Sequence, residues 1–468
     1  MIVNRLKYIV FGLFLVAAVM QSQAQTVESL NEEAIEFLKQ ENYEKAVSTL
    51  TKAIKTKPSY AESYFNMGFT YYCMSRYDDA MQWYKKTIIV DSNYADAYVN
   101  VGLVYNQKKQ YFEAIEWCRR ALSKDSTLAN AHTNMGVAYG GLGRYDDAVK
   151  CYRKALSLDS TSAITYNNIG NAYNNLGQFN RGVSYLKKAV ELQPNYASAY
   201  YSMGLAYARL EMPDDAVRYY KKAVELEPRL ITVYNDMGNA YASTGDYDKA
   251  IECFRMSVDK APKYVDAYHN LGMLYYERKK YDTAAVWFKR ATLIDSEHSQ
   301  SYYACGIAYY MQGNHKEALN WYRKAVEHNP QHATAYNSMG YVYQEQKDFT
   351  KAIECYKKAI AASPKYLAAY NNLGALYINL KRYTEAVDCY SSAVNVDTKK
   401  AESYYNLGVA YYLSGDKERA VAELEKAVSL KANYFDALHN LGVIYDELGQ
   451  PAKAKLYRDK ADKAEFGY

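Results

Sequence analysis

Apolar and polar positions recur along the chain with a period of 34 residues. From Val27 to Tyr468 the sequence divides into thirteen frames of this length with nothing left over. Within a frame, positions 4, 7, 8 and 11 hold small, apolar or aromatic residues at the spacing of one helix face, and positions 20, 24 and 27 do the same for a second helix. The pattern predicts two helices per frame and an all-α fold. The frames are 27–60, 61–94, 95–128, 129–162, 163–196, 197–230, 231–264, 265–298, 299–332, 333–366, 367–400, 401–434 and 435–468.

Small and large residues alternate at fixed positions of the frame. Position 8 is Gly in twelve frames and Ala34 in the first, position 20 is Ala in twelve with Gly182 as the exception, and position 11 is Tyr in twelve. A small residue on one helix allows the other helix to approach closely, and a large ring fills the space beside it. We therefore expect the two helices of each frame to pack against each other.

Helix-breaking residues fall between the expected helices. Six of the eight prolines share position 32, where the second helix ends, and six glycines share position 15, where the first helix ends. A residue in the left-handed conformation at such a place satisfies the last carbonyl groups of a helix. The breakers therefore predict a helix, a tight turn and a second helix in each frame.

These landmarks resemble the tetratricopeptide repeat family, whose pattern has a large residue at position 4, Leu-Gly at 7 and 8, Tyr at 11, small residues at 20 and 27, and Pro at 32. The resemblance covers 442 of the 468 residues, although position 4 is Tyr in ten frames where the family has Trp. It implies an α-solenoid, a right-handed superhelix of helix-turn-helix units that share one continuous core. The last helix has Arg458 at position 24, which is usually aromatic, and is expected to be a polar helix that caps the C-terminal end of the array.

One side of each first helix is left for a partner. At about 100° per residue, positions 2, 5, 6, 9, 12 and 13 face neither the second helix nor the adjacent repeat. We call these six positions the free arc. The resemblance implies that the free arc lines a concave surface on which extended peptides or partner helices lie.

Asparagine is the most regular residue of the free arc. A carboxamide both donates and accepts hydrogen bonds, so a row of them could hold a peptide backbone, although Asn is common at position 6 in the family and can simply face water. Position 6 is asparagine at Asn66, Asn100, Asn134, Asn168, Asn270, Asn372, Asn406 and Asn440. The fifth and seventh frames add Asn167, Asn171, Asn174, Asn235 and Asn239.

Tyrosine is the second candidate residue type on the free arc. Aromatic rings beside amides suit peptide or glycan contacts, and the alternative is that the rings pack between neighbouring first helices. The eighth, ninth, tenth and twelfth frames offer Tyr276, Tyr303, Tyr310, Tyr341, Tyr405 and Tyr412 on the free arc.

Charge on the free arc differs from charge on the whole chain. The chain carries a net charge of +5, yet the free arc holds twelve acidic residues against Lys39 and Arg209 alone. Half of these acids stand at position 2, where the helix dipole favours a carboxylate in any case. The balance suggests a partner with basic segments. The Lys and Arg pairs late in the second helices complement the C-terminal dipole and predict a solvated outer face rather than a nucleic-acid surface.

The N-terminus predicts export. Arg5 and Lys7 precede the apolar run 9–20, and Ser22-Gln23-Ala24 is a small-x-small cleavage site, so residues 1–24 read as a signal peptide. The segment resembles Sec signals of Gram-negative bacteria and predicts a periplasmic protein with no membrane span after cleavage. A retained N-terminal anchor and an extracellular location are the alternatives.

No pattern of catalytic or metal-binding residues is present in the sequence. The seven cysteines are odd in number and form no CxxC pair, so we expect buried free thiols, and the seven histidines scatter over different frame positions. We therefore expect neither a cofactor nor a metal. The sequence favours a non-enzymatic scaffold of the cell envelope that binds a peptide or helix of a partner protein. The alternative is a binder of cell-envelope glycan or peptidoglycan, and the oligomeric state stays open.

Overall fold

A computed structural model of the chain describes residues 26–466. The predicted signal peptide, residues 1–24, lies outside the described residues. Between residues 26 and 466 all regular secondary structure is helical, so the predicted all-α fold of helix-turn-helix repeats is confirmed. None of the described helices is both long enough and apolar enough to cross a bilayer.

The described chain forms two compact units, which we call the N-terminal unit and the C-terminal unit. The first ends at Thr244 and the second begins at Gly245, in the turn of the seventh frame. The expectation that one continuous core runs through all thirteen frames therefore remains a prediction across the boundary between the two units.

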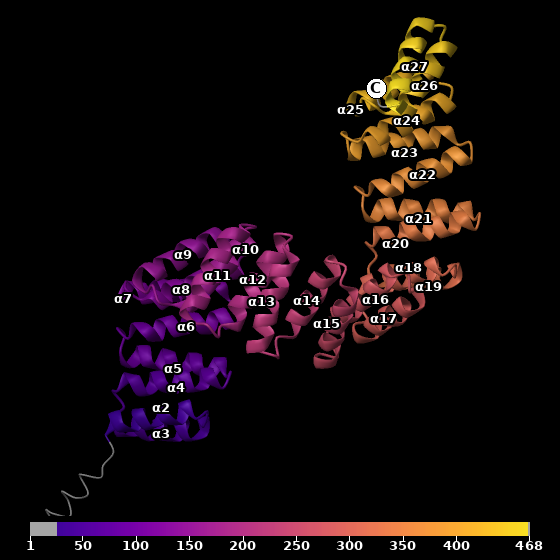
Figure 1. The fold of residues 1–468 in the computed structure, drawn as a ribbon. Coiled ribbons are helices and arrows are strands. Elements are labelled where there is room, and N and C mark those ends of the chain that lie inside the picture. The colour runs from indigo at the N-terminus through magenta and orange to yellow at the C-terminus, as the bar shows by residue number, and fades with distance from the viewer. Residues whose placement is uncertain (1–25, 467–468) are drawn as a thin grey trace, which may run out of the picture. The chain divides into compact units, whose positions relative to one another are not determined.

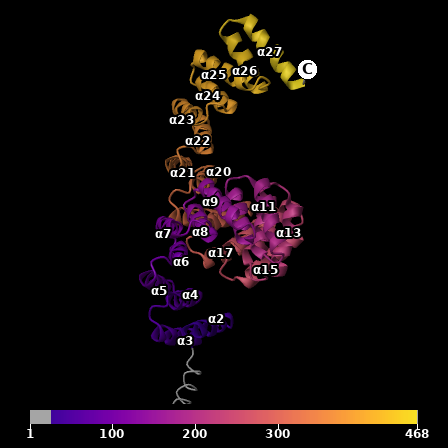
Figure 2. The ribbon, with the colours of Figure 1, turned by 90° about the vertical axis from the view of Figure 1, so that its left-hand side faces the viewer.

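The N-terminal unit contains seven first helices and six second helices within its described residues (Figures 1 and 2). The first helices are α2 (Val27–Lys39), α4 (Ala61–Cys73), α6 (Ala95–Gln107), α8 (Ala129–Gly141), α10 (Ala163–Asn175), α12 (Ala197–Arg209) and α14 (Ile231–Ser243). The second helices are α3 (Tyr43–Thr56), α5 (Tyr77–Val90), α7 (Tyr111–Lys124), α9 (Tyr145–Leu158), α11 (Phe179–Leu192) and α13 (Pro213–Leu226).

The C-terminal unit begins with the second helix of the seventh frame and continues with six helix pairs, as far as the structure describes it. Its first helices are α16 (Val265–Glu277), α18 (Ser299–Met311), α20 (Ala333–Glu345), α22 (Leu367–Asn379), α24 (Ala401–Leu413) and α26 (Phe435–Glu447). Its second helices are α15 (Tyr247–Lys260), α17 (Tyr281–Ile294), α19 (His315–His328), α21 (Phe349–Ala362), α23 (Tyr383–Val396), α25 (Lys417–Leu430) and α27 (Pro451–Phe466). Within each unit a second helix packs on its own first helix and on the first helix of the next frame.

Position 8 and position 24 meet where the two helices of a frame come closest. A methyl group built on Gly136 of α8 would lie 2.4 Å from the ring of Tyr152 of α9, and one built on Gly306 of α18 would lie 2.5 Å from the ring of Tyr322 of α19. Only glycine leaves room for a ring pressed flat on the helix backbone. The alternation of small and large residues in the sequence therefore corresponds to direct contact.

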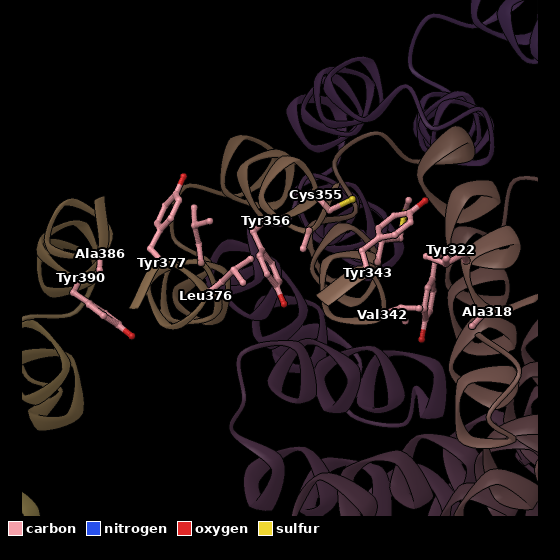
Figure 3. Packing of buried hydrophobic residues seen from close by; sticks show 14 of the residues in the cluster. Ala318, Tyr322, Val342, Tyr343, Cys355, Tyr356, Leu376, Tyr377, Ala386 and Tyr390 are labelled. Carbon is pink, nitrogen blue, oxygen red and sulfur yellow. The ribbon is translucent and has the colours of Figure 1, made fainter. Parts of the chain in front are cut away.

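The core of each unit is a row of such contacts. In the C-terminal unit Tyr322, Tyr356 and Tyr390, all at position 24, lie one after another along the row, with Tyr343 and Tyr377 of position 11 between them (Figure 3). All five rings are at least nine-tenths buried. Each repeat thus covers the apolar face of its neighbour, which is how a solenoid buries a core that one hairpin could not enclose.

Tyrosine hydroxyl groups join neighbouring frames. In at least five frames of the described chain the hydroxyl at position 4 donates to the carbonyl of position 32 in the preceding frame, as Tyr98 does to Ser92 over 3.1 Å. In at least six frames the hydroxyl at position 11 meets a side chain of position 25 in the preceding frame, as Tyr173 does with Arg153 over 2.7 Å. A buried ring with a hydrogen-bonded hydroxyl is what favours Tyr over Phe at both positions.

The turn between the helices requires a left-handed residue at position 15 in every frame. The six glycines at this position have positive φ, and so do the seven other residues there, for example Lys347 at 61° and Lys381 at 58°. The next amide closes the turn on position 11, as Asp348 N does on Tyr343 O over 2.9 Å. The expected helix end is therefore present even where glycine is absent, at a cost in backbone strain.

The cysteines only partly match expectation. All seven are free thiols, and Cys118, Cys253, Cys305 and Cys355 are buried. Cys73 is exposed and Cys151 and Cys389 are half-buried, so the expectation of burial was wrong for these three. The reason for Cys73 is its position 13, which belongs to the free arc, where the side chain lines an open cleft.

Candidate functional site

The free arc forms a cleft at the start of the N-terminal unit. The cleft has a volume of about 570 Å³, and its lining comes from first helices α2, α4 and α6, together with Tyr43 of α3. Its apolar lining includes Ile35, Leu38, Phe65 and Phe69, and its amides are Asn66 and Asn100. Three consecutive repeats therefore contribute to one surface.

Position 9 supplies an apolar stripe along the first four frames. Phe69 is 43% exposed and Val137 is 37% exposed, while Ile35 and Leu103 are half-buried. These four side chains lie one helix turn after the position 6 residues of the same helices, so the stripe runs beside the amide row. Apolar side chains exposed in register on successive repeats are typical of a binding surface.

Three asparagines of the predicted row are available for a ligand. Asn100, Asn134 and Asn168 occupy position 6 of α6, α8 and α10 and are half-buried. Among the described residues, no hydrogen-bond partner is found for any of these three side chains. We call these three residues the amide ladder.

Other position 6 asparagines are held by the neighbouring repeat. Their partner is position 5 of the preceding frame: Asn66 Nδ2 donates to Asn31 Oδ1 over 3.0 Å, and Asn372 Nδ2 donates to Asn337 Oδ1 over 2.9 Å. Asn440 Nδ2 reaches the hydroxyl of Tyr405 at 3.5 Å. These residues join repeats, so the structure does not assemble all eight asparagines into one binding row.

The remaining predicted amides divide by exposure. Asn167 and Asn235 are buried, Asn174 Nδ2 donates to Ser202 O over 3.2 Å, and Asn239 is exposed beside a second cavity of about 510 Å³. The half-buried members are Asn171, Asn174, Asn270 and Asn406. Asn171 stands at position 9 of α10, one helix turn after Asn168 of the amide ladder.

Most of the predicted tyrosines pack between neighbouring helices. The hydroxyl of Tyr303 lies 3.3 Å from Ser338 Oγ in the next frame, Tyr310 donates to Glu345 and Tyr412 donates to Glu447. The ring of Tyr276 lies 5.4 Å from that of Tyr281, and Tyr405 lies 5.1 Å from Tyr434. Tyr341 is the exposed member, at 45%. These contacts favour the packing interpretation over the aromatic binding surface.

The helices that line the cleft also carry four acidic residues that no cation pairs with in the described chain. Among the described residues, Glu28, Glu32, Glu62 and Asp96 form no ion pair. In the C-terminal unit the free-arc acids Glu402, Asp446 and Glu447 are paired with Lys400, Arg458 and Lys417, whereas Asp266, Glu277 and Asp436 form no ion pair among the described residues. What distinguishes the first three frames is that all four of their free-arc acids lack an ion pair.

Two tyrosines respond to this negative charge. Tyr60 donates to Glu62 Oε2 over 2.7 Å, and this bond, with further effect from Glu28 and Glu32, raises the pKa of Tyr60 to about 12. Burial, followed by the nearby Glu62 and Asp96, raises the pKa of Tyr94 to about 12. The carboxylate of Glu62 therefore contributes to both shifts, after burial at Tyr94 and through a direct hydrogen bond at Tyr60.

Sequence reasoning missed two sets of residues. It overlooked the apolar stripe of position 9, although a reading of that position frame by frame shows Ile35, Phe69, Leu103 and Val137 in a row. It also overlooked position 5, where Asn31 and Asn337 decide which position 6 amides are already bonded. Hydrogen bonds between repeats join side chains that are 35 residues apart in the sequence, so no local sequence pattern predicts them.

Solved structures with a similar arrangement are numerous. Yeast Tom70 matches with a TM-score of 0.43 and 15% identity over 88% of this chain and 96% of that one. MamA protein matches with a TM-score of 0.33 and 28% identity over 36% of this chain and 92% of that one. YrrB, described as a TPR protein with an unusual peptide-binding site, matches with a TM-score of 0.34 and 24% identity over 41% of this chain and 98% of that one. No curated protein matches the sequence.

Family models match along most of the array. Tetratricopeptide repeat models match residues 129–162 and 333–366, residues 161–228, 229–297, 264–331 and 365–433, and residues 435–466. A TPR repeat model matches residues 35–75 and 102–143. These matches agree with the helix-turn-helix frames, the glycine and tyrosine contacts and the left-handed turns described above, and together they cover well over half of the sequence. The chain belongs to the tetratricopeptide repeat family.

Proposed function

We propose that this protein is a non-enzymatic scaffold of the bacterial cell envelope that binds a segment of a partner protein on the free arc of its N-terminal unit. Membership of the tetratricopeptide repeat family supports a role in protein–protein interaction in general. The observation that carries the finer proposal is the amide ladder, Asn100, Asn134 and Asn168, whose side chains have no hydrogen-bond partner among the described residues.

The spacing expected for the ladder suits a peptide backbone. Neighbouring helices lie about 8 to 10 Å apart, and an extended chain rises about 3.3 Å per residue, so successive rungs would meet about every third residue of a peptide. Each carboxamide can accept from a backbone N–H and donate to a carbonyl. Binding of this kind holds the main chain and leaves the bound side chains to contact the apolar stripe.

The same surface fits a protein segment better than a glycan. The glycan alternative needs exposed aromatic faces, and most tyrosines of the free arc bond or stack with their own neighbours. The apolar side chains at position 9 beside the ladder instead suit large apolar side chains of a partner.

The location in the cell envelope rests on the signal peptide expected from residues 1–24. Fractionation of cells that express the protein, followed by sequencing of its N-terminus, tests this part. We expect the periplasmic fraction to contain a chain that begins at Gln25. A full-length chain in the membrane fraction would favour the retained anchor.

Peptide binding is tested by selecting 16-residue peptides from a displayed library on residues 25–468 and measuring the affinity of the selected peptides by fluorescence anisotropy. The ladder variant replaces Asn100, Asn134 and Asn168 with Ala. A net hydrogen bond contributes about 0.5 to 1.5 kcal/mol, so the loss of three should weaken binding about tenfold or more. Circular dichroism should show unchanged helicity.

A matched control replaces three exposed asparagines outside the free arc. Asn93, Asn195 and Asn433 all stand at position 33, in the loops between frames, and are exposed. Their replacement by Ala changes composition equally and should leave peptide affinity unchanged. Equal affinity of the ladder variant and this control, or a failure to select any peptide, would refute the proposal.

A further inference from the structure

We propose that the cleft over the first three repeats binds an amphipathic segment with Lys or Arg side chains on one side and large apolar side chains on the other. This inference rests on the proposed function and names the chemistry of the partner. It follows from three features: the apolar floor of the cleft, the acids without ion pairs on the helices that line it, which we call the acidic edge, and the separation of these two sets along each helix.

The apolar floor is large enough for several partner side chains. The cleft holds about 570 Å³ and is lined by Ile35, Leu38, Phe65 and Phe69, with Phe69 left 43% exposed. An exposed phenylalanine in a concave apolar surface gains most when a second apolar group removes it from water. The floor thus selects a partner with bulky apolar residues.

The acidic edge selects the charge of the partner. Glu28, Glu62 and Asp96 stand at position 2 of α2, α4 and α6, and Glu32 stands at position 6 of α2. They form no ion pair among the described residues, and Glu28, Glu32 and Asp96 are exposed. Lys39, the one cation that lines the cleft, already bonds Glu36 over 2.6 Å. Cationic side chains of a partner would complete this surface, and anionic ones would be repelled.

The two features lie at a separation that one segment can span. Position 2 and position 9 of one helix differ by seven residues, or about 10 Å along the helix axis. A partner that crosses successive first helices therefore has the acids along one of its sides and the apolar floor along the other. A helix with side chains is about 10 to 12 Å across, which matches this width.

Three synthetic peptides of 18 residues test the chemistry directly. The first has Leu on one helical face and Lys on the other, the second has the same Leu pattern with Glu, and the third keeps the Lys residues but replaces Leu with Ser. Binding to residues 25–468 is measured by fluorescence anisotropy in 0.05 M and 0.5 M salt. We expect the Leu and Lys peptide to bind at least tenfold more tightly than either of the others. Its affinity should fall at high salt because exposed charges are screened.

Two variants of the protein separate the floor from the edge. The acid variant, E28Q with E32Q, E62Q and D96N, should lose at least tenfold in affinity for the Leu and Lys peptide and most of the salt dependence. The floor variant, F69S, should lose affinity and keep the salt dependence. The matched control is E113Q with D146N, D214N and D282N, which neutralises four exposed acids in the first turns of second helices and should bind as the unmodified chain does.

The outcomes distinguish this inference from the proposed function. Equal affinity for the Lys and Glu peptides, or an acid variant that binds like its control, would overturn the inference. If library peptides then still bind through the amide ladder without an excess of Lys or Arg, the proposed function stands alone. If no peptide binds the unmodified chain, both the inference and the proposed function are refuted.

Discussion

Two glycines of α8 should respond in opposite ways to the same substitution. A methyl group on Gly136 would lie 2.4 Å from the ring of Tyr152, whereas one on Gly140, four residues later in the same helix, would have no neighbour within 4 Å. Both substitutions replace Gly with Ala in a helix, so both remove a similar amount of backbone entropy from the unfolded chain. Packing is the difference between them.

The magnitudes follow from these distances. Gly is less favourable than Ala in a helix by about 0.8 to 1 kcal/mol, so Gly140→Ala should stabilise α8 by up to about that amount. Gly136→Ala gains the same amount but forces the Tyr152 ring or the α9 backbone to move, and overpacking typically costs about 1 to 3 kcal/mol. The two variants should therefore differ by about 1 to 3 kcal/mol, with Gly136→Ala the less stable.

Hydrogen exchange suits this measurement because repeat arrays open locally and need not unfold in one step. The opening free energies of amides in α8 and α9 should rise in Gly140→Ala. In Gly136→Ala they should be lower than in Gly140→Ala. Amides of the C-terminal unit serve as the internal reference. The reasoning would be refuted if both variants shifted equally, or if Gly136→Ala were the more protected.

Two further substitutions test the turns and a buried histidine. Lys347→Gly should stabilise the tenth frame by about 0.5 to 1 kcal/mol, because Lys347 holds a φ of 61° that glycine adopts without strain. Thermal unfolding measures this, and a variant less stable than the unmodified chain would contradict it. Burial, and then the nearby His298, lower the pKa of His269 to about 4. Because the unfolded imidazole binds its proton near pH 6.5, the unfolded state gains protons first, and stability should fall by about 1 to 3 kcal/mol as pH drops from 6.5 to 4. The His269→Asn variant should not show this loss of stability at low pH. Urea unfolding of the unmodified chain and of the variant at pH 7 and pH 4.5 measures it. An equal loss of unfolding free energy in the two proteins would contradict the prediction.

The repeat and its core were predictable from the sequence because they depend on local spacing. A helix face is set by residues three and four apart, and a turn by a breaker at one position, so the recurrence of Gly at position 8, Ala at position 20 and Tyr at position 11 was enough to predict the helix pairs. The left-handed residue at position 15 was predictable at Gly313 but not at Lys347, since only the geometry of the turn demands it there. Repetition strengthened each of these signals.

The candidate site was predictable only in outline. The free arc was found from helix geometry, but Asn66 and Asn134, which look alike in the sequence, differ because Asn66 bonds to Asn31 while the side chain of Asn134 bonds to no other described residue. Tyr310 likewise looks free in the sequence, but its hydroxyl donates a hydrogen bond to Glu345 in the next repeat. The chain alone determined which side chains share a face. Packing of one repeat on the next decided which of those side chains remain free to bind, because each hydrogen bond needs a partner about 35 residues away at a particular distance and angle.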